Sequence, residues 1–235
     1  MTFKLLSTAN PKTQKGVKLG YLTYILHLSP YTVAGVGNAC PAATPGCIAA
    51  CLNTAGRGGM FPVGGTNTVQ EARKRKTRLF FANKTEFMQL VAADIKKAIA
   101  QAARKNLIPV FRLNGTSDIS WEKYAVGGTD KNIFETFPGE QFYDYTKILG
   151  RKVKDIANYH LTFSRAENND ADCAKAAAEG LNVATVYDVI PTGIHNADDT
   201  DLRFLDGTVG IVGLKAKGRA RKDYSGFVIR IKAEQ

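Results

Sequence analysis

The feature that most constrains the fold is an alternation of helix-like and strand-like segments between residues 83 and 214. Helical periodicity predicts helices over 83–105 and 170–179, and short runs of branched and aromatic residues predict strands. The predicted strands cover 19–28, 108–113, 142–146, 159–163, 182–187, 209–214 and 227–231. Because strands that alternate with helices form parallel sheets, we predict an α/β fold, either a partial β/α barrel or an open, mostly parallel sheet.

The helix over 83–105 has the strongest pattern. Its apolar residues recur at helical spacing and are Phe87, Leu90, Val91, Ile95, Ala98, Ile99 and Ala102. Asn83, followed three residues later by Glu86, resembles a capping box and predicts the start of this helix. Residues 29–65, in contrast, are rich in Gly, Pro, Ala and Cys and predict a long irregular segment, which in a compact domain usually serves function.

The composition predicts a single domain over residues 1–235 with an anionic partner. The formal net charge is +11 and the pI is about 9.5, which favours a phosphorylated small-molecule substrate or a nucleic acid. No apolar run approaches the roughly 20 residues that span a bilayer, and no signal-peptide pattern opens the chain. We therefore expect a cytoplasmic protein without a membrane partner, whose thiols stay reduced.

Three of the four cysteines lie within twelve residues, in a loop that covers residues 38–52. Cys40, Cys47 and Cys51 have the spacing C-x6-C-x3-C. If one helical turn joined Cys47 to Cys51, both thiols would point the same way, and the prolines and glycine before Cys47 could turn Cys40 towards them. Three thiolates without a nearby fourth ligand suit a [4Fe–4S] cluster with one open iron.

Two other interpretations of the cysteines stay open at this stage. Structural zinc sites usually have four ligands in closer C-x(2–4)-C pairs, and ordinary buried thiols are common. Cys173 falls within a predicted helix and His27 at the end of a predicted strand, and a structural role is expected for both.

Polar residues follow the predicted strands, at the edge of the sheet where parallel α/β folds place their sites. We expect Asp118 and Asp188 to be candidate catalytic bases and Arg165 a candidate anion-binding residue. The residues expected to line a cofactor or substrate cavity are Asn114, Ser117, Tyr145, Ser164 and Lys215. Each of them could instead be a turn residue or a helix cap.

Two basic segments could contact phosphates. The first is residues 73–78, and in the second Lys215, Lys217, Arg219 and Arg221 would share one face of a strand. A solvated surface is the alternative, and no aromatic residue is interleaved with either run to support base stacking.

Four segments resemble a family of phage-encoded proteins that carry an N-terminal cysteine cluster. They read CPAATPGCIAACLNTAGRG, VFRLNGTSDISWE, FYDYTK and YHLTFSRAEN. This family is distantly similar to the radical S-adenosylmethionine enzymes, which have a partial β/α barrel and a three-cysteine loop after the first strand. The resemblance implies that Cys40, Cys47 and Cys51 hold a [4Fe–4S] cluster in the host cytoplasm, with S-adenosylmethionine as a possible second cofactor.

The spacing of the cysteines keeps two kinds of chemistry open. Radical S-adenosylmethionine enzymes typically have C-x3-C-x2-C, whereas this chain has C-x6-C-x3-C. Desulfidases and hydro-lyases use an open iron as a Lewis acid or sulfur acceptor and need no second cofactor. Our leading hypothesis is therefore an open-site iron–sulfur enzyme, and the alternative is a metal-braced basic module that binds nucleic acid.

Overall fold

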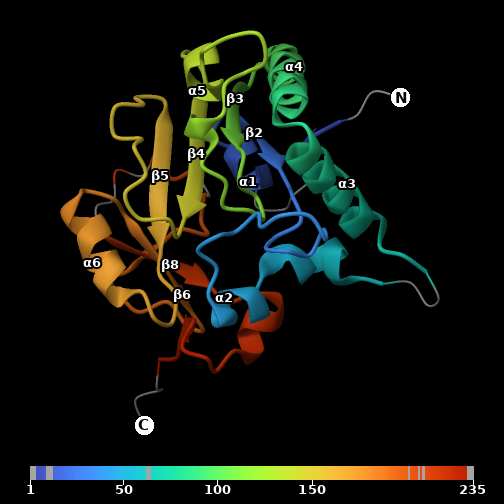
Figure 1. Cartoon of the computed structure of the whole chain (residues 1–235). Helices are drawn as coiled ribbons and strands as arrows, with labels where there is room; N and C mark the ends of the chain where they lie inside the picture. The colour runs from blue at the N-terminus through green and yellow to red at the C-terminus, as the bar shows by residue number, and fades with distance from the viewer. Residues whose placement is uncertain are drawn as a thin grey trace.

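The sheet is wound in one direction, and most of its strands follow each other in chain order (Figure 1). The computed structural model describes residues 4–8, 13–61, 65–200, 202–205, 207 and 210–231. Within these ranges nine strands form one open sheet in the order β1-β2-β3-β4-β5-β6-β8-β7, and β9 also pairs with β6. Only β1 is antiparallel to its neighbour, so the predicted α/β fold with an open, mostly parallel sheet is confirmed.

The predicted strands lie close to their expected positions. The strands of the sheet are β1 (Leu6–Ser7), β2 (Tyr21–Leu26), β3 (Ile108–Arg112), β4 (Gln141–Thr146), β5 (Tyr159–Ser164), β6 (Val183–Tyr187), β7 (His195–Asn196), β8 (Ile211–Lys215) and β9 (Val228–Ile229). Because β2 to β6 and β8 are parallel, their carboxyl ends meet at one edge, which we call the carboxyl edge. In Figure 1 the arrows of β4 and β5 point down towards this edge.

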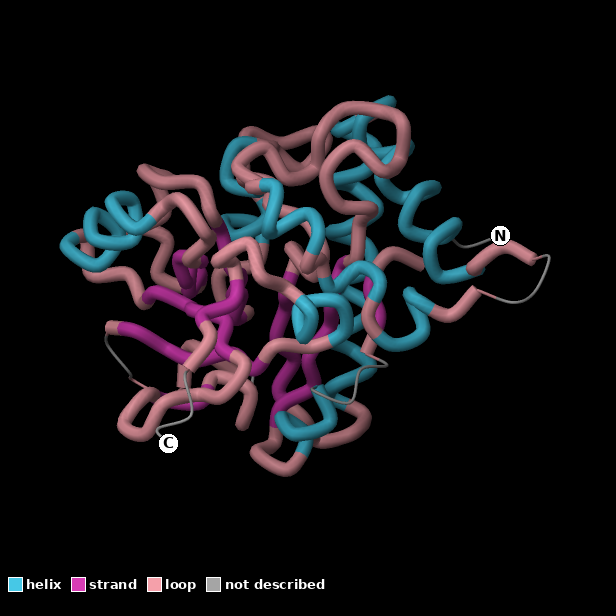
Figure 2. The backbone as a smooth tube through the Cα atoms, turned by 90° about the horizontal axis from the view of Figure 1, so that it is seen from below, coloured by secondary structure: helices cyan, strands magenta, loops and turns pink. Residues whose placement is uncertain are grey.

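The helices include both predicted ones and a long one that the sequence pattern did not reveal. They are α1 (Thr13–Val17), α2 (Pro45–Ala49), α3 (Thr68–Ala82), α4 (Lys84–Ala103), α5 (Ile133–Thr136) and α6 (Asp170–Ala178). Four short 3-10 turns, η1 (Leu52–Thr54), η2 (Gly56–Gly59), η3 (Trp121–Lys123) and η4 (Gly218–Lys222), lie in the connections. Viewed from below, the strands run through the middle of the molecule, with helices and loops around them (Figure 2). Within the described ranges, no helix combines the length and the apolar character that a membrane span requires.

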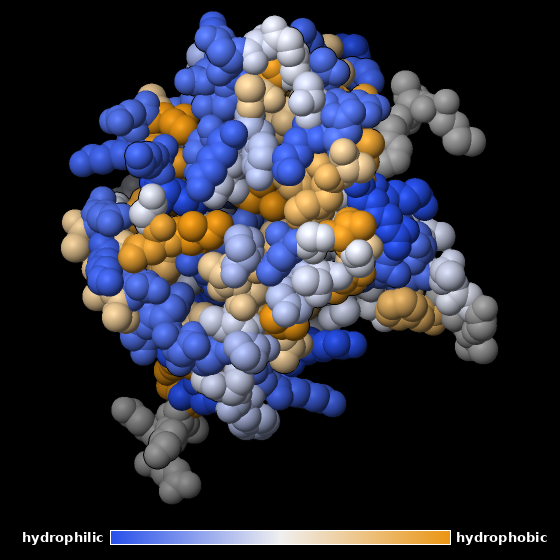
Figure 3. All heavy atoms as spheres, in the orientation of Figure 1, coloured by the Kyte–Doolittle hydropathy of each residue, from blue (hydrophilic) through white to orange (hydrophobic). Residues whose placement is uncertain are grey.

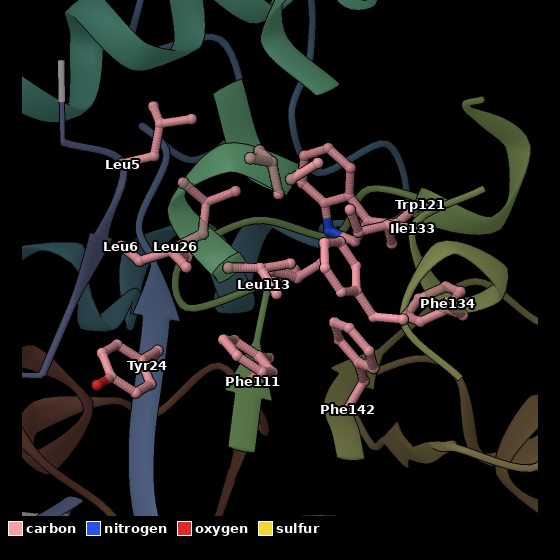
Figure 4. Close-up of a cluster of buried hydrophobic side chains, with 14 of the residues drawn as sticks. Leu5, Leu6, Tyr24, Leu26, Phe111, Leu113, Trp121, Ile133, Phe134 and Phe142 are labelled. Carbon is pink, nitrogen blue, oxygen red and sulfur yellow. The ribbon is translucent and has the colours of Figure 1, made fainter. Parts of the chain in front are cut away.

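The main core lies between the sheet and helices α3 and α4. Phe87, Val91 and Ile95 from the predicted apolar stripe of α4 are fully buried against β2, β3 and β4. In Figure 4, the rings of Phe111, Phe142 and Phe134 lie in a row below Trp121. The ring centroids of Phe111 and Phe142 are 5.3 Å apart. This packed face holds the strands in position. The loops that follow the strands lie at the carboxyl edge.

Candidate functional site

The cysteine loop follows β2, the first strand of the parallel run, and lies at the carboxyl edge. Figure 1 shows α2 of this loop in front of and below the ends of β4 and β5. Cys40, Cys47 and Cys51 are free thiols and partly buried. Separate contacts attach each of them to a different part of the edge.

Cys40 is attached to the connection that follows β3. Its sulfur lies 3.8 Å from the carbonyl oxygen of Thr116, and its backbone NH donates to Asn38 Oδ1 at 2.8 Å. The neighbouring Ala39 carbonyl accepts a hydrogen bond of 2.8 Å from the NH of Asp118. The first cysteine is therefore fixed by residues 114–118, a segment that sequence reasoning placed at the site.

Cys47 lies in α2, whose first turn is held by a carboxylate from beyond β5. Thr44 caps this helix by accepting a bond of 3.2 Å from the Cys47 NH. Glu167 accepts from the Thr44 hydroxyl and from the Gly46 NH, both at 2.7 Å. A Cβ on Gly46 would lie 2.3 Å from Ser225 Oγ and 2.7 Å from Glu167 Oε2, so a larger residue here would displace both side chains.

Cys51 lies outside the helix, which ends at Ala49, so the expectation that one helical turn joins Cys47 to Cys51 is wrong. Cys51 instead caps η1, and its sulfur accepts a bond of 3.5 Å from the Asn53 NH. Arg73 donates to Asn53 Oδ1 at 2.7 Å, and Gln70 donates to the Asn53 carbonyl at 2.8 Å. Helix α3 therefore supports the third cysteine.

The three thiols lie close enough to influence one another electrostatically. Burial, with smaller contributions from Asp118, Cys51 and Cys47, raises the pKa of Cys40 to about 12, although a hydrogen bond with the Tyr31 backbone opposes the rise. Burial also raises the pKa of Cys51, which the positive charges of Lys147 and Arg73 partly oppose. These two thiols are therefore protonated at neutral pH in the metal-free protein, and metal binding would displace their protons.

The described residues contain no group of three or more His, Cys, Asp or Glu side chains arranged around a single metal ion. In a zinc site all sulfurs lie about 2.3 Å from one ion and so crowd together. In a four-iron cluster each thiolate binds its own iron, and the sulfurs lie further apart. The loop geometry does not form a single-ion site in the described ranges.

Two expected cavity residues, Asn114 and Ser117, and the candidate base Asp118 organise the connection after β3. Asn114 Oδ1 accepts from Ser117 Oγ at 2.9 Å, from the Ile119 NH at 2.9 Å and from Trp121 Nε1 at 3.1 Å. Asp118 accepts 2.7 Å bonds from Thr146 Oγ1 and from the Lys147 NH. Burial raises the pKa of Asp118, and these bonds oppose the rise.

Tyr145, Ser164 and Lys215 lie at or near the ends of neighbouring strands. The Arg112 guanidinium lies 4.9 Å from the centroid of the Tyr145 ring. Ser164 pairs with Ala184 in the sheet and its carbonyl accepts from Asn169. Lys215 ends β8 with an exposed side chain. These residues share the carboxyl edge, as predicted.

Arg165 and Asp188 hold the C-terminal segment in place. Arg165 donates to the Gly226 carbonyl at 2.7 Å and pairs with Asp170 at 3.1 Å. Asp188 accepts from the Ile231 NH at 3.0 Å and lies 3.6 Å from Arg230. The bond from Ile231, with the bond from Val189 and the charge of Arg230, lowers the pKa of Asp188.

The two basic segments differ from their expected form. Most cations of residues 73–78 have partners within the chain, because Lys74 pairs with Glu71, Lys76 donates to the Leu5 carbonyl and Arg78 to the Ala34 carbonyl. Lys215, Lys217, Arg219 and Arg221 do not share a strand face, because β8 ends at Lys215 and Gly218, at φ +55°, turns the chain into η4.

Sequence reasoning missed a buried polar network on the helix side of the sheet. Asp144 on β4 accepts from the Asn114 NH at 2.7 Å and from the Tyr159 hydroxyl at 3.2 Å. Arg151 donates to Tyr159 at 3.2 Å and makes a two-point pair with Glu122 at 2.5 and 3.1 Å. Burial raises the pKa of Asp144 to about 7, although Arg112 and its hydrogen bonds oppose this. An acidic residue in the middle of a strand was the only sequence signal.

Glu167 was also missed as a support of the cysteine loop. It follows the predicted strand 159–163, but its partners Thr44 and Gly46 lie 123 and 121 residues away. His27 lies at the end of β2, where burial and the charges of Arg73, Arg112 and Lys76 lower its pKa to about 3, so it is neutral.

The comparisons with known proteins give one match. A family model described as Gene product 88 matches residues 4–231. No curated protein and no solved structure matches the chain.

Proposed function

The chain belongs to the Gene product 88 family, a phage gene-product family, and we propose that it is an enzyme with an open-site [4Fe–4S] cluster. Cys40, Cys47 and Cys51 would hold the cluster. The observation that carries the proposal is that three partly buried thiols lie on one loop at the carboxyl edge of a parallel sheet. That edge is where parallel α/β folds build their active sites.

The surroundings of the loop suit an anionic cluster. Arg73 and Lys147 act electrostatically on Cys51, and positive charge stabilises thiolates that bind a metal. Partial burial of all three sulfurs would limit solvent access, which tunes the potential of such a cluster. When bound, the cluster would supply an open iron as a Lewis acid or as the holder of a second cofactor such as S-adenosylmethionine.

The residues beside the loop would serve the substrate. Asp118 lies between the Cys40 segment and β4, and burial raises its pKa, the direction that favours a carboxyl group as a general base. Asn114 and Ser117 would keep this connection in position, and Tyr145, Ser164 and Lys215 would border the substrate. Arg165 and Asp188 we now assign to the support of the C-terminal segment, because their polar atoms are engaged there.

The test is anaerobic purification followed by iron and sulfide analysis and an absorption spectrum. We expect about four irons and four sulfides per chain, with a colour that dithionite bleaches. Cys47→Ala should lose the cluster, whereas the matched control Cys173→Ala should keep it, because Cys173 lies in α6 and bonds to Asn169. Full iron content in Cys47→Ala would exclude this ligand set.

A further inference from the structure

The segment 215–230 forms a positive surface whose acidic group is turned inward. It contains six cations and one carboxylate, Asp223. Asp223 is 7% exposed and accepts from the Val228 NH at 3.0 Å and from Ser225 Oγ at 2.8 Å. The exposed cations are Lys215, Lys217, Arg219, Arg221 and Lys222. Hydrophilic residues are spread over the face seen in Figure 3 and include the lower part of the molecule, where the red segment η4 lies in Figure 1.

An exposed aromatic ring lies directly beside these cations. Tyr224 is 85% exposed, the largest value among the exposed large hydrophobic and aromatic residues of the described ranges. The Arg230 guanidinium lies 4.6 Å from the centroid of its ring. Arg230 is itself held by the carbonyls of Arg221, at 2.7 Å, and Asp223, at 2.8 Å. The ring is therefore backed by a fixed cation, and most of its surface faces solvent.

We propose that this surface binds single-stranded nucleic acid, with an unpaired base stacked on Tyr224 and phosphates on the cations of η4. A basic surface that carries an aromatic ring is how proteins bind single strands without sequence preference. The cation behind the ring adds to stacking. A duplex fits less well, because its bases are already stacked and its major groove is read by a long helix or a β-ribbon. The element here is a five-residue 3-10 turn.

The surface adjoins the cysteine loop. Ala220 of η4 packs with Ala50, which lies between Cys47 and Cys51, and a Cβ on Gly218 would lie 3.4 Å from Ala55 Cβ. A bound strand would therefore lie beside the loop. The inference goes beyond the proposed function, and it includes no cysteine, so its test is independent of the cluster.

The experiment measures the fluorescence anisotropy of a labelled oligothymidylate with the full-length protein at several salt concentrations. We expect log Kobs to fall linearly with log salt, by about 0.7 per phosphate contacted. Tyr224→Ala should weaken binding by about 5- to 150-fold, the effect of losing one stacked base, whereas Tyr224→Phe should keep the affinity. Because the side chain is exposed, both variants should melt like the unaltered protein.

Charge variants test the phosphate contacts. The double variant R221Q/K222Q should reduce the salt slope by about 1.4, because two phosphate contacts are lost. The matched control is K96Q/K105Q, which removes two exposed cations at α4, far from η4 in Figure 1, and should leave binding unchanged.

Three results would overturn the proposal. The first is an affinity for the oligonucleotide that changes neither in Tyr224→Ala nor in R221Q/K222Q. The second is equal or tighter binding of a duplex of the same length. The third is displacement of the oligonucleotide by polyglutamate at equal charge concentration, which would assign the surface to an acidic protein.

Discussion

At the scale of single residues, the main surprise is how many polar groups are buried. Asp144 is 1% exposed, and the side chain of Arg151 is 2% exposed. Buried charges are costly unless they are paired and hydrogen-bonded, and the network around Tyr159 pairs Arg151 with Glu122 but leaves Arg151 Nη1 without a hydrogen-bond partner among the described residues. Asn114 joins this network to the segment that holds Cys40, so the network fixes the connection on which the candidate site depends.

Asp144 gives a pH dependence with a defined sign. Its folded pKa of about 7 exceeds the unfolded value of about 3.9, so the folded state binds an extra proton between these values. Its contribution to stability is therefore complete below about pH 4 and is lost as the pH rises to about 7. At about 1.4 kcal/mol per pKa unit, the loss is at most about 4 kcal/mol.

Asp144→Asn should remove this dependence, because an amide keeps the shape of the side chain but does not titrate. We expect the free energy of unfolding of the variant, measured with urea, to change less between pH 4 and pH 7 than that of the unaltered protein. Equal pH dependence in both proteins would show that Asp144 is ionised throughout this range.

At the scale of elements, one residue ends one helix and begins the next. The Asn83 NH donates to the Leu79 carbonyl at the end of α3, and its side chain accepts from the Glu86 NH at 3.0 Å at the start of α4. Only half of the predicted capping box is present, because Glu86 Oε2 accepts from Asn83 Nδ2 at 3.2 Å, whereas the Asn83 NH is used by α3. The angle between the two core helices therefore depends on this residue.

Asn83→Ala should destabilise the protein by about 1 kcal/mol, within the usual range of about 0.5 to 2 for a lost helix cap. Asn83→Asp, which keeps the accepting oxygen, should lose much less. Thermal unfolding of both variants measures the difference, and an equal loss in the two would mean that the cap bond contributes little.

How much of the fold the sequence predicts differs between elements for physical reasons. The helix over 83–105 was predicted within two residues of its bounds because its buried face is apolar. Helix α3 was missed because its buried residues include Gln70 and Thr77, which leave only a weak apolar stripe. The cations of residues 215–221 do not share a strand face, because the chain turns at Gly218.

The candidate site was predictable only in part. Local sequence identified the three cysteines and the polar residues after each strand. It could not reveal that Glu167 holds α2 or that Arg73 holds Asn53, because these contacts join segments far apart in the chain. It also placed Cys47 and Cys51 on one helical turn, whereas Cys51 caps the next turn instead.

At the scale of the whole molecule, the C-terminal segment of the described chain packs against the cysteine loop. Ala50 packs against Ala216, Ala220 and Val228, and Ser225 lies against Gly46. The C-terminal segment thus supports the loop directly, and strand β9 attaches it to the sheet through β6.

Val228→Ala should therefore loosen the cysteine loop. Val228 is 2% exposed, and shortening it leaves space beside Ala50. In the metal-free protein we expect faster alkylation of Cys47 and Cys51, read by mass spectrometry, with Cys173 unchanged. The matched control Ile211→Ala, at a side chain 51% exposed, should react like the unaltered protein. Equal rates in Val228→Ala would show that the loop is rigid without this contact.

The packing of Ala50 against residues 216–228 also has a consequence for biosynthesis. The ribosome makes the cysteines well before the segment that covers them. Since β2 to β6 can pair in chain order before β9 is made, the cysteines remain without this cover until residues 216–228 have emerged. Any cofactor that needs the finished loop is therefore loaded only after that segment has been made.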